Sequence, residues 1–209
     1  MAEWLIDELD RDLAARRREL IDLRLLVSAA DGSRGMMIAR TCQVMAYAHW
    51  EGFSKHALRR YLDHLVKMRV KLGDLKYELQ ALALMGHMKE AVAAERSVTG
   101  SASLLRTLDC RGTELFSVDA GEVIRVGNMT SENLRTLLEC VALPYLADYS
   151  IRENFIDSVV CGRRHRIAHG EWQPIATSEA RSVIGDVLKL CTTLNDQVQT
   201  AALYKQYLA

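Results

Sequence analysis

Apolar residues recur at intervals of three and four along most of the chain, which is the period of an amphipathic helix. Residues 3–30 show the pattern through leucines: Leu5, Leu9, Leu13, Leu20 and Leu23. A longer pattern covers about residues 34–70, and a third begins at Asp74 and runs to about Ser97. Met85 and Met88 continue the apolar positions of this third segment, so we expect both to pack inward.

The next stretch, residues 97–126, has no sustained period. Turn-forming residues interrupt short apolar pieces there, at residues 99–101, 109–112 and 119–121. Such punctuation is typical of loops. We therefore expect a long irregular insertion with one short helix or strand.

The helical spacing of apolar residues resumes after residue 126. Thr130 or Ser131 can cap a short helix that Leu143-Pro144 ends, and Thr177 can start a final helix that runs to about Tyr207. The whole pattern predicts an all-α helical bundle in one domain, residues 1–209, with an irregular insertion around residues 97–126.

Between these two helices lies the segment with the most chemistry. Ser150 with Glu153 three residues later resembles a capping box, which predicts a helix start at Ser150. Apolar positions then follow at helical spacing: Phe155, Ile156, Val159, Val160 and Ile167. Gly170 predicts the helix end, because a left-handed backbone costs glycine little.

The last turns of this helix carry three arginines and two histidines in seven residues: Arg163, Arg164, His165, Arg166 and His169. One interpretation is structural, because cations are favourable at a helix C-terminus and His169 could serve as a cap. The other is a phosphodiester site. Arginine binds phosphate in a bidentate fork, and histidine can move a proton at a ribose hydroxyl near neutral pH.

Residues 164–170, Arg-His-Arg-Ile-Ala-His-Gly, resemble the R-x4-6-H signature of the HEPN superfamily. Many members have asparagine directly after the arginine, where this chain has His165. Arg163 would also satisfy the spacing with one more intervening residue. We assign Arg164 as the motif arginine because it aligns with the Ile-Ala-His-Gly tail.

Two further segments carry the resemblance. Residues 44–62 include Tyr47 and the run Trp-Glu-Gly-Phe around Glu51, which is similar to a long helix of bacterial HEPN proteins found in toxin and restriction loci. The short helix with Asn133-Leu134 is a weaker match. Residues 55–76, after the Trp-Glu-Gly-Phe run, are basic, with seven Lys or Arg against two Asp. This stretch is a solvated helix face or a surface that follows phosphates.

The resemblance implies a metal-independent endoribonuclease that needs no cofactor. In such HEPN enzymes the motif helices of two chains face each other across a homodimer, so one composite cleft holds two copies of each group. His169 would act as acid or base and Arg164 would neutralise the phosphate, leaving a 2′,3′-cyclic phosphate. Supporting or substrate-binding roles would fall to Arg163, His165, Arg166 and Glu51.

The partners implied are RNA, a second copy of the chain and an antitoxin protein. A non-catalytic HEPN domain that binds a nucleotide or scaffolds a protein is the alternative. A zinc site is a further alternative, because His165 and His169 are four residues apart. No third ligand stands at a suitable spacing, so we expect no metal.

Composition changes this picture little. The formal net charge is +0, so any nucleic-acid surface must be local. The five cysteines form no C-x-x-C pair, which is typical of reduced thiols in a cytosolic protein. No apolar run is long enough to span a membrane and no basic leader precedes an apolar segment, so we expect a cytoplasmic protein without a membrane partner.

Overall fold

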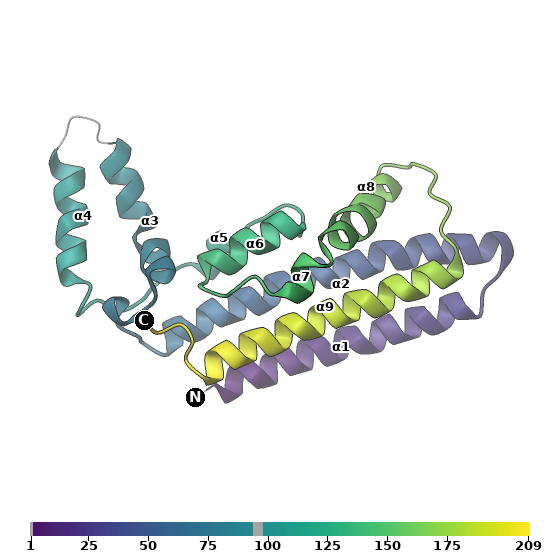
Figure 1. Ribbon diagram of the computed structural model, residues 1–209, viewed down its shortest axis with the longest axis horizontal. Helices are drawn as coiled ribbons and strands as arrows, with labels where there is room; N and C mark the ends of the chain where they lie inside the picture. Colours follow the sequence, from purple (N-terminus) through teal and green to yellow (C-terminus); the bar gives the residue numbers. More distant parts are fainter. Residues whose placement is uncertain (1, 94–97) are drawn as a thin grey trace.

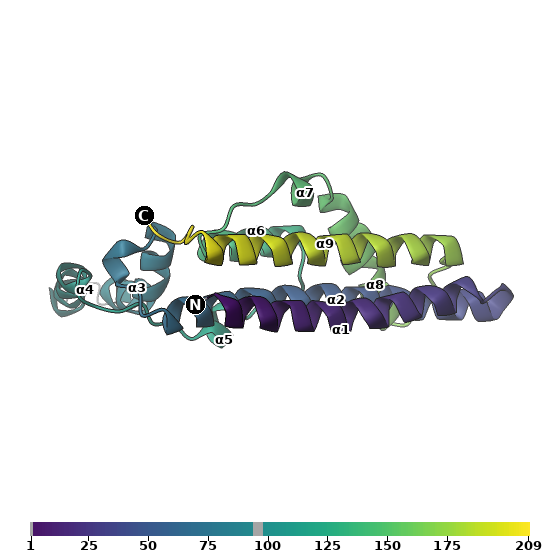
Figure 2. The same ribbon diagram turned by 90° about the horizontal axis from the view of Figure 1, so that it is seen from below.

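Three long helices lie side by side along the molecule in the computed structural model, which describes residues 2–93 and 98–209. These are α1 (Glu3–Ser28), α2 (Gly32–Lys67) and α9 (Thr177–Leu203). Figures 1 and 2 show that the three run almost the full length of the bundle. Since α9 lies against both α1 and α2, the end of the chain closes a core that its first two helices begin.

The leucine pattern of α1 explains its place in the bundle. Leu5, Leu9 and Leu20 are completely buried, whereas the residues between them are mostly exposed. Helix α2 is buried on more of its surface, and it carries several of the largest core side chains, including Trp50, Phe53 and Tyr61. Burying each of these side chains contributes about 1.5–3 kcal/mol. Packing of apolar faces therefore holds the bundle together.

Two helices form a hairpin at one end of the bundle (Figure 1). They are α3 (Tyr77–Ala93) and α4 (Val98–Cys110), and α4 packs against α3. The prediction of an irregular insertion is therefore wrong over residues 98–110. The turn-forming residues 99–101 fall in the first turn of α4, where a helix tolerates them, and contact with α3 supports the rest.

The same hairpin corrects a second prediction. Met85 and Met88 are 43% and 44% exposed, although their spacing indicated core positions. Because α3 packs mainly on α4, its later turns have no bundle surface to cover. The apolar spacing predicts the helix correctly, but the prediction that Met85 and Met88 pack inward is wrong.

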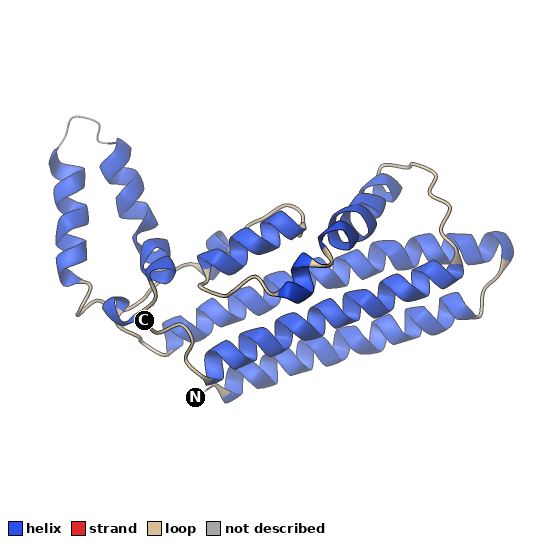
Figure 3. Cartoon of the chain, in the orientation of Figure 1, coloured by secondary structure: helices blue, strands red, loops and turns tan. Residues whose placement is uncertain are grey.

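Short elements lie on either side of the hairpin, the first between α2 and α3 and the others after α4. They are η1 (Leu72–Asp74), α5 (Ala120–Val123), α6 (Ser131–Cys140) and α7 (Ala147–Ser150). The backbone N–H of Asn133 donates to Thr130 Oγ1 at 3.2 Å, so the predicted cap of the short helix is confirmed at Thr130. The described residues contain helices and loops without a strand, as Figure 3 shows, and the all-α prediction is confirmed. None of their helices is long and apolar enough to cross a membrane.

The segment before the Arg/His cluster differs from its prediction. Ser150 ends α7, and its Oγ donates back to the Ala147 carbonyl at 3.0 Å, so it starts no new helix. The chain is already turning here, since the N–H groups of residues 151 and 152 also bond backward. A π-helix, η2 (Phe155–Gly162), follows and passes directly into α8 (Arg163–Ala168).

Candidate functional site

The Arg/His cluster lies on α8, which packs against α2. Gly170 has φ +84°, the left-handed conformation that glycine adopts readily. Its N–H donates to the Ile167 carbonyl at 3.1 Å, and the N–H of Glu171 donates to the Arg166 carbonyl at 3.0 Å. This pair of bonds is a Schellman motif. The predicted helix end at Gly170 is confirmed.

Arg164 is half-buried against α2. Its guanidinium carbon lies 3.8 Å from the centroid of the Tyr47 ring, and its Nη2 donates to Asn128 Oδ1 at 2.6 Å. The Tyr47 hydroxyl donates to the same oxygen at 3.1 Å. Ring stacking and a charge-assisted hydrogen bond therefore fix the plane of the guanidinium before any ligand arrives.

Glu51 belongs to the same cluster. It lies one turn after Tyr47 on α2, and its Oε1 is 2.5 Å from Lys55 Nζ. Burial raises the pKa of the Tyr47 hydroxyl well above its usual value, and the neighbouring Glu51 carboxylate raises it further. Tyr47 therefore stays protonated near neutral pH and keeps donating to Asn128.

Arg163 points elsewhere. Its Nη1 is 2.6 Å from Glu179 Oε1 on α9, so an acidic partner already balances its charge. Consecutive helical residues lie about 100° apart, which is why the two arginines reach different helices. An arginine without a carboxylate partner is better placed to meet a phosphate, and this favours Arg164 over Arg163 as the motif residue.

The two histidines are exposed and adjacent. The ring centroids of His165 and His169 are 4.3 Å apart with an interplanar angle of 56°, as expected for side chains four residues apart. Arg166 is also exposed. Five residues correspond to about 140° around a helix, so His169 faces solvent whereas Arg164 lies against α2. Among the described residues, no three His, Cys, Asp or Glu side chains gather as metal ligands.

Sequence reasoning missed Asn128 as a site residue. It lies in the loop before α6, 36 residues from Arg164, and no spacing rule connects the two. Asn133 holds this loop by donating from Nδ2 to the Asn128 carbonyl at 2.7 Å. Only the fold reveals that the Asn-Leu segment and the motif helix meet.

The π-helix before the motif has buried polar contacts of its own. Gln43 is fully buried, and its Nε2 donates to the Val159 carbonyl at 2.8 Å. The Cys161 thiol donates to the Met129 carbonyl at 3.4 Å, and burial raises its pKa to about 12. Cys161 therefore stays a thiol and serves packing. Single π-turns occur frequently at functional sites, and here one positions the start of α8.

Asp157 connects this π-helix to the start of α6. Its two oxygens accept from the backbone N–H of Ser131 at 2.7 Å and from the Ser131 hydroxyl at 2.5 Å. We expect Asp157→Asn to lower the free energy of unfolding by about 1–3 kcal/mol, because both bonds lose a charged acceptor. Urea denaturation measures this, with the exposed Asp148→Asn as control. Equal stability of the two variants would show that the bonds contribute little.

The family model described as HEPN_MAE_28990-like HEPN matches residues 5–207. The chain belongs to this HEPN family. No curated protein and no solved structure matches it. The HEPN resemblance inferred from residues 164–170 is thereby confirmed, and the match covers nearly the whole chain. The roles of individual residues rest on the geometry described above.

Proposed function

We propose that this HEPN protein is a metal-independent endoribonuclease whose site is completed by a second copy of the chain. The arrangement of the motif carries the proposal. Arg164 is pre-oriented by Tyr47 and Asn128, whereas His169 is exposed on another side of the same short helix. One chain therefore presents a fixed cation and an accessible acid–base group on different sides of one short helix.

The chemistry needs only these groups. A neutral His169 takes the proton of a ribose 2′-hydroxyl, and the oxygen attacks the adjacent phosphorus. The bond from phosphorus to the 5′-oxygen breaks, and a protonated histidine gives that oxygen a proton. Arg164 neutralises charge on the phosphate in the transition state. The products are a 2′,3′-cyclic phosphate and a 5′-hydroxyl. The exposed His165 and Arg166 support RNA binding, whereas Arg163 and Glu51 act through their ion pairs with Glu179 and Lys55.

The surface beside the motif suits contact with a second copy. Trp172 is 65% exposed in the loop after α8, and Met37 is 61% exposed near the start of α2. Arg40 joins these regions, because its Nη2 donates to the Glu171 carbonyl at 3.3 Å and its guanidinium carbon lies 5.0 Å from the Trp172 ring centroid. A two-fold contact here would bury apolar side chains and bring two motif helices together.

Residues 44–62 resemble a helix of toxin-associated HEPN proteins, and this resemblance supports a proposal about the cellular role. We expect a toxin or defence effector that acts on RNA in the cytoplasm, with an antitoxin protein as a further partner.

The test uses the wild-type chain in EDTA with single-stranded RNA and single-stranded DNA of the same sequence. We expect cleavage of the RNA alone, with 2′,3′-cyclic phosphate ends, because the 2′-hydroxyl is the nucleophile. End analysis by mass spectrometry identifies the products. Cleavage of DNA, or cleavage that requires added Mg²⁺, would contradict the mechanism.

A non-catalytic binding domain is the second candidate, and one observation favours it. One of the five N–H donors of the Arg164 guanidinium already bonds Asn128 Oδ1, so fewer donors remain for a transition state, whereas the others can still hold a ground-state phosphate. Tight binding of RNA or a nucleotide by a dimeric, folded chain that cuts neither would support this candidate.

A further inference from the structure

A polar cleft with a volume of about 530 Å³ lies between α1, α2 and the start of α5 with the loop before it. Most of its charged side chains are half-buried. Four permanent cations line it against two carboxylates, and the lining includes Arg16, Lys55, His56, Arg59, Arg60, Asp63 and Asp119. Three of the basic residues in 55–76, Lys55, Arg59 and Arg60, therefore line a concave site.

Arg16 is built into the wall of this cleft. Its Nε and Nη2 donate to the two oxygens of Asp12 at 2.6 and 3.3 Å. The guanidinium rests on Gly52 of α2, where an added Cβ would lie 2.8 Å from Nη1. Glycine is otherwise unfavourable inside a helix, and here it provides the space that the arginine occupies.

Arg59 provides an unbalanced charge. Its Nη2 donates to the Ile124 carbonyl at 3.2 Å, but among the described residues no carboxylate lies within 4.0 Å of it. The Nε atom of Arg59 is buried without a hydrogen-bond acceptor, whereas Arg60 Nε lies 3.7 Å from Glu8 Oε1. Buried donors of this kind cost free energy unless a ligand supplies the acceptor, and an anion at the cleft would do so.

One stripe of side chains on α2 leads from the cleft towards the motif. Tyr47, Glu51, Lys55 and Arg59 are four residues apart along α2, so their side chains form one stripe. Lys55 Nζ lies 3.5 Å from the Gly127 carbonyl, which places the stripe along the loop that carries Asn128. Twelve residues of helix separate Tyr47 from Arg59 by about 18 Å, a distance that a strand of several nucleotides can span.

We propose that this cleft is a phosphate-binding site. The phosphate comes either from the backbone of an RNA whose scissile bond lies at the motif or from a free nucleotide. The RNA source rests on the proposed function, whereas the nucleotide source is independent of it. Arg16, Arg59 and Arg60 would contact the phosphate, and the carboxylates that pair with Arg16 and Arg60 hold those cations in place.

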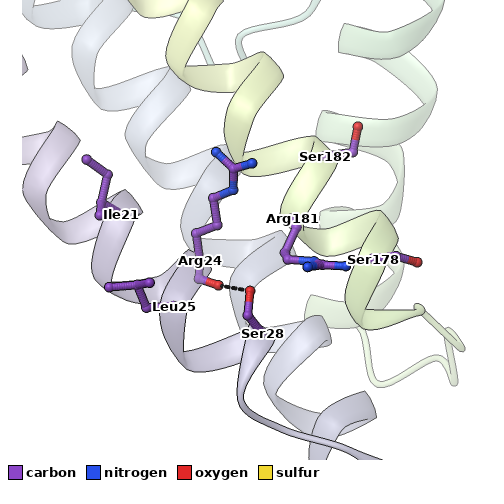
Figure 4. A pocket seen from close by; sticks show the side chains of 7 residues that line it. All are labelled: Ile21, Arg24, Leu25, Ser28, Ser178, Arg181 and Ser182. Atoms are coloured by element: carbon purple, nitrogen blue, oxygen red, sulfur yellow. Dashed lines mark hydrogen bonds between the residues drawn. The ribbon is translucent and has the colours of Figure 1, made fainter.

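A second arginine groove provides a matched control. It lies between α1 and α9 and is drawn in Figure 4, lined by Ile21, Arg24, Leu25, Ser28, Ser178, Arg181 and Ser182. Arg24 and Arg181 are both exposed, and within the described residues no ion pair holds either one. Arg24→Gln therefore removes one positive charge from α1 without touching the cleft.

The experiment measures binding rather than cleavage. Fluorescence anisotropy in EDTA follows a labelled 2′-O-methyl oligoribonucleotide, which lacks the nucleophile, and a labelled ATP analogue, at several salt concentrations. We expect Arg59→Gln to weaken binding by about tenfold. The slope of log Kd against log salt should fall by about one for the oligonucleotide, whereas Arg24→Gln should change little.

Gly52→Ala separates binding from folding. The new Cβ displaces the flexible end of Arg16, while alanine favours the helix, so the melting temperature should hold or rise as affinity falls. Loss of oligonucleotide binding in both variants supports the RNA source, and loss of ATP binding alone supports the nucleotide. The proposal is overturned when both ligands bind these variants as they bind Arg24→Gln, or when the wild type binds neither.

The binding experiment and the cleavage experiment can contradict their proposals independently of each other. A wild-type chain that cuts no RNA but loses ligand through Arg59→Gln would remove the proposed nuclease and leave the phosphate site. Cleavage of RNA by the wild type, without any effect of Arg59→Gln on ligand binding, would support the nuclease and remove the phosphate site.

Discussion

His169→Ala is expected to lower the rate of RNA cleavage by about 10²–10⁴, the range that general acid–base catalysis contributes. The folded state should be unaffected, because the side chain is exposed and its ring contacts only the neighbouring His165 ring among the described aromatic residues. Single-turnover cleavage of a labelled RNA in EDTA measures the rate, and thermal melting of the same sample reports folding.

His165→Ala is the matched comparison. It removes the other ring of the same pair from the same exposed face, and we expect a loss of less than about tenfold because the residue supports binding only. A greater loss for His165→Ala than for His169→Ala would assign the acid–base role to His165. Equal cutting by wild type and both variants would point to a contaminating nuclease.

Local patterns in the sequence were sufficient for the long helices and for two of the helix ends. The leucines of α1 repeat within one face, and Thr130 and Gly170 mark ends through backbone chemistry that depends on neighbours in sequence. Such features need no tertiary information. They also predicted correctly that the helix carrying the motif ends at Gly170.

Features that depend on tertiary contact were beyond this reasoning. Helix α4 starts with residues that favour turns, and it is stabilised by α3 rather than by its own propensity. Ser150 had a plausible partner in Glu153, but its hydroxyl bonds backward because α7 already ends there. The contact between Asn128 and Arg164 joins a loop and a helix that no periodicity relates.

The choice between two adjacent arginines shows how the fold sharpens a motif. In the sequence, Arg163 and Arg164 differ by one intervening residue before the same histidine. In the fold, the first pairs with Glu179 on the bundle and the second stacks on Tyr47 with Asn128 as acceptor. Their expected effects on catalysis therefore differ strongly.

Arg164→Ala should lower the cleavage rate by about 10²–10³, comparable to the loss of one electrostatic stabiliser of a transition state. Arg164→Lys should recover only part of this loss, since an ammonium group cannot form the planar fork or stack in the same way on Tyr47. Arg163→Ala should leave the rate nearly unchanged and cost about 0–1 kcal/mol of stability, because its ion pair is partly exposed. The reverse order of effects would make Arg163 the motif residue.

Mixing the two inactive variants tests whether the site is shared between chains. In a mixed dimer, the Arg164→Ala chain still supplies an intact His169, and the His169→Ala chain still supplies an intact Arg164. If the composite cleft uses one group from each chain, the mixture should recover activity that neither variant has alone, after subunits exchange. Because each pure variant lacks one of the two groups in both chains, recovery could not come from either homodimer. An inactive mixture with proven exchange would mean either that a working site takes both groups from one chain or that it needs both copies of one group.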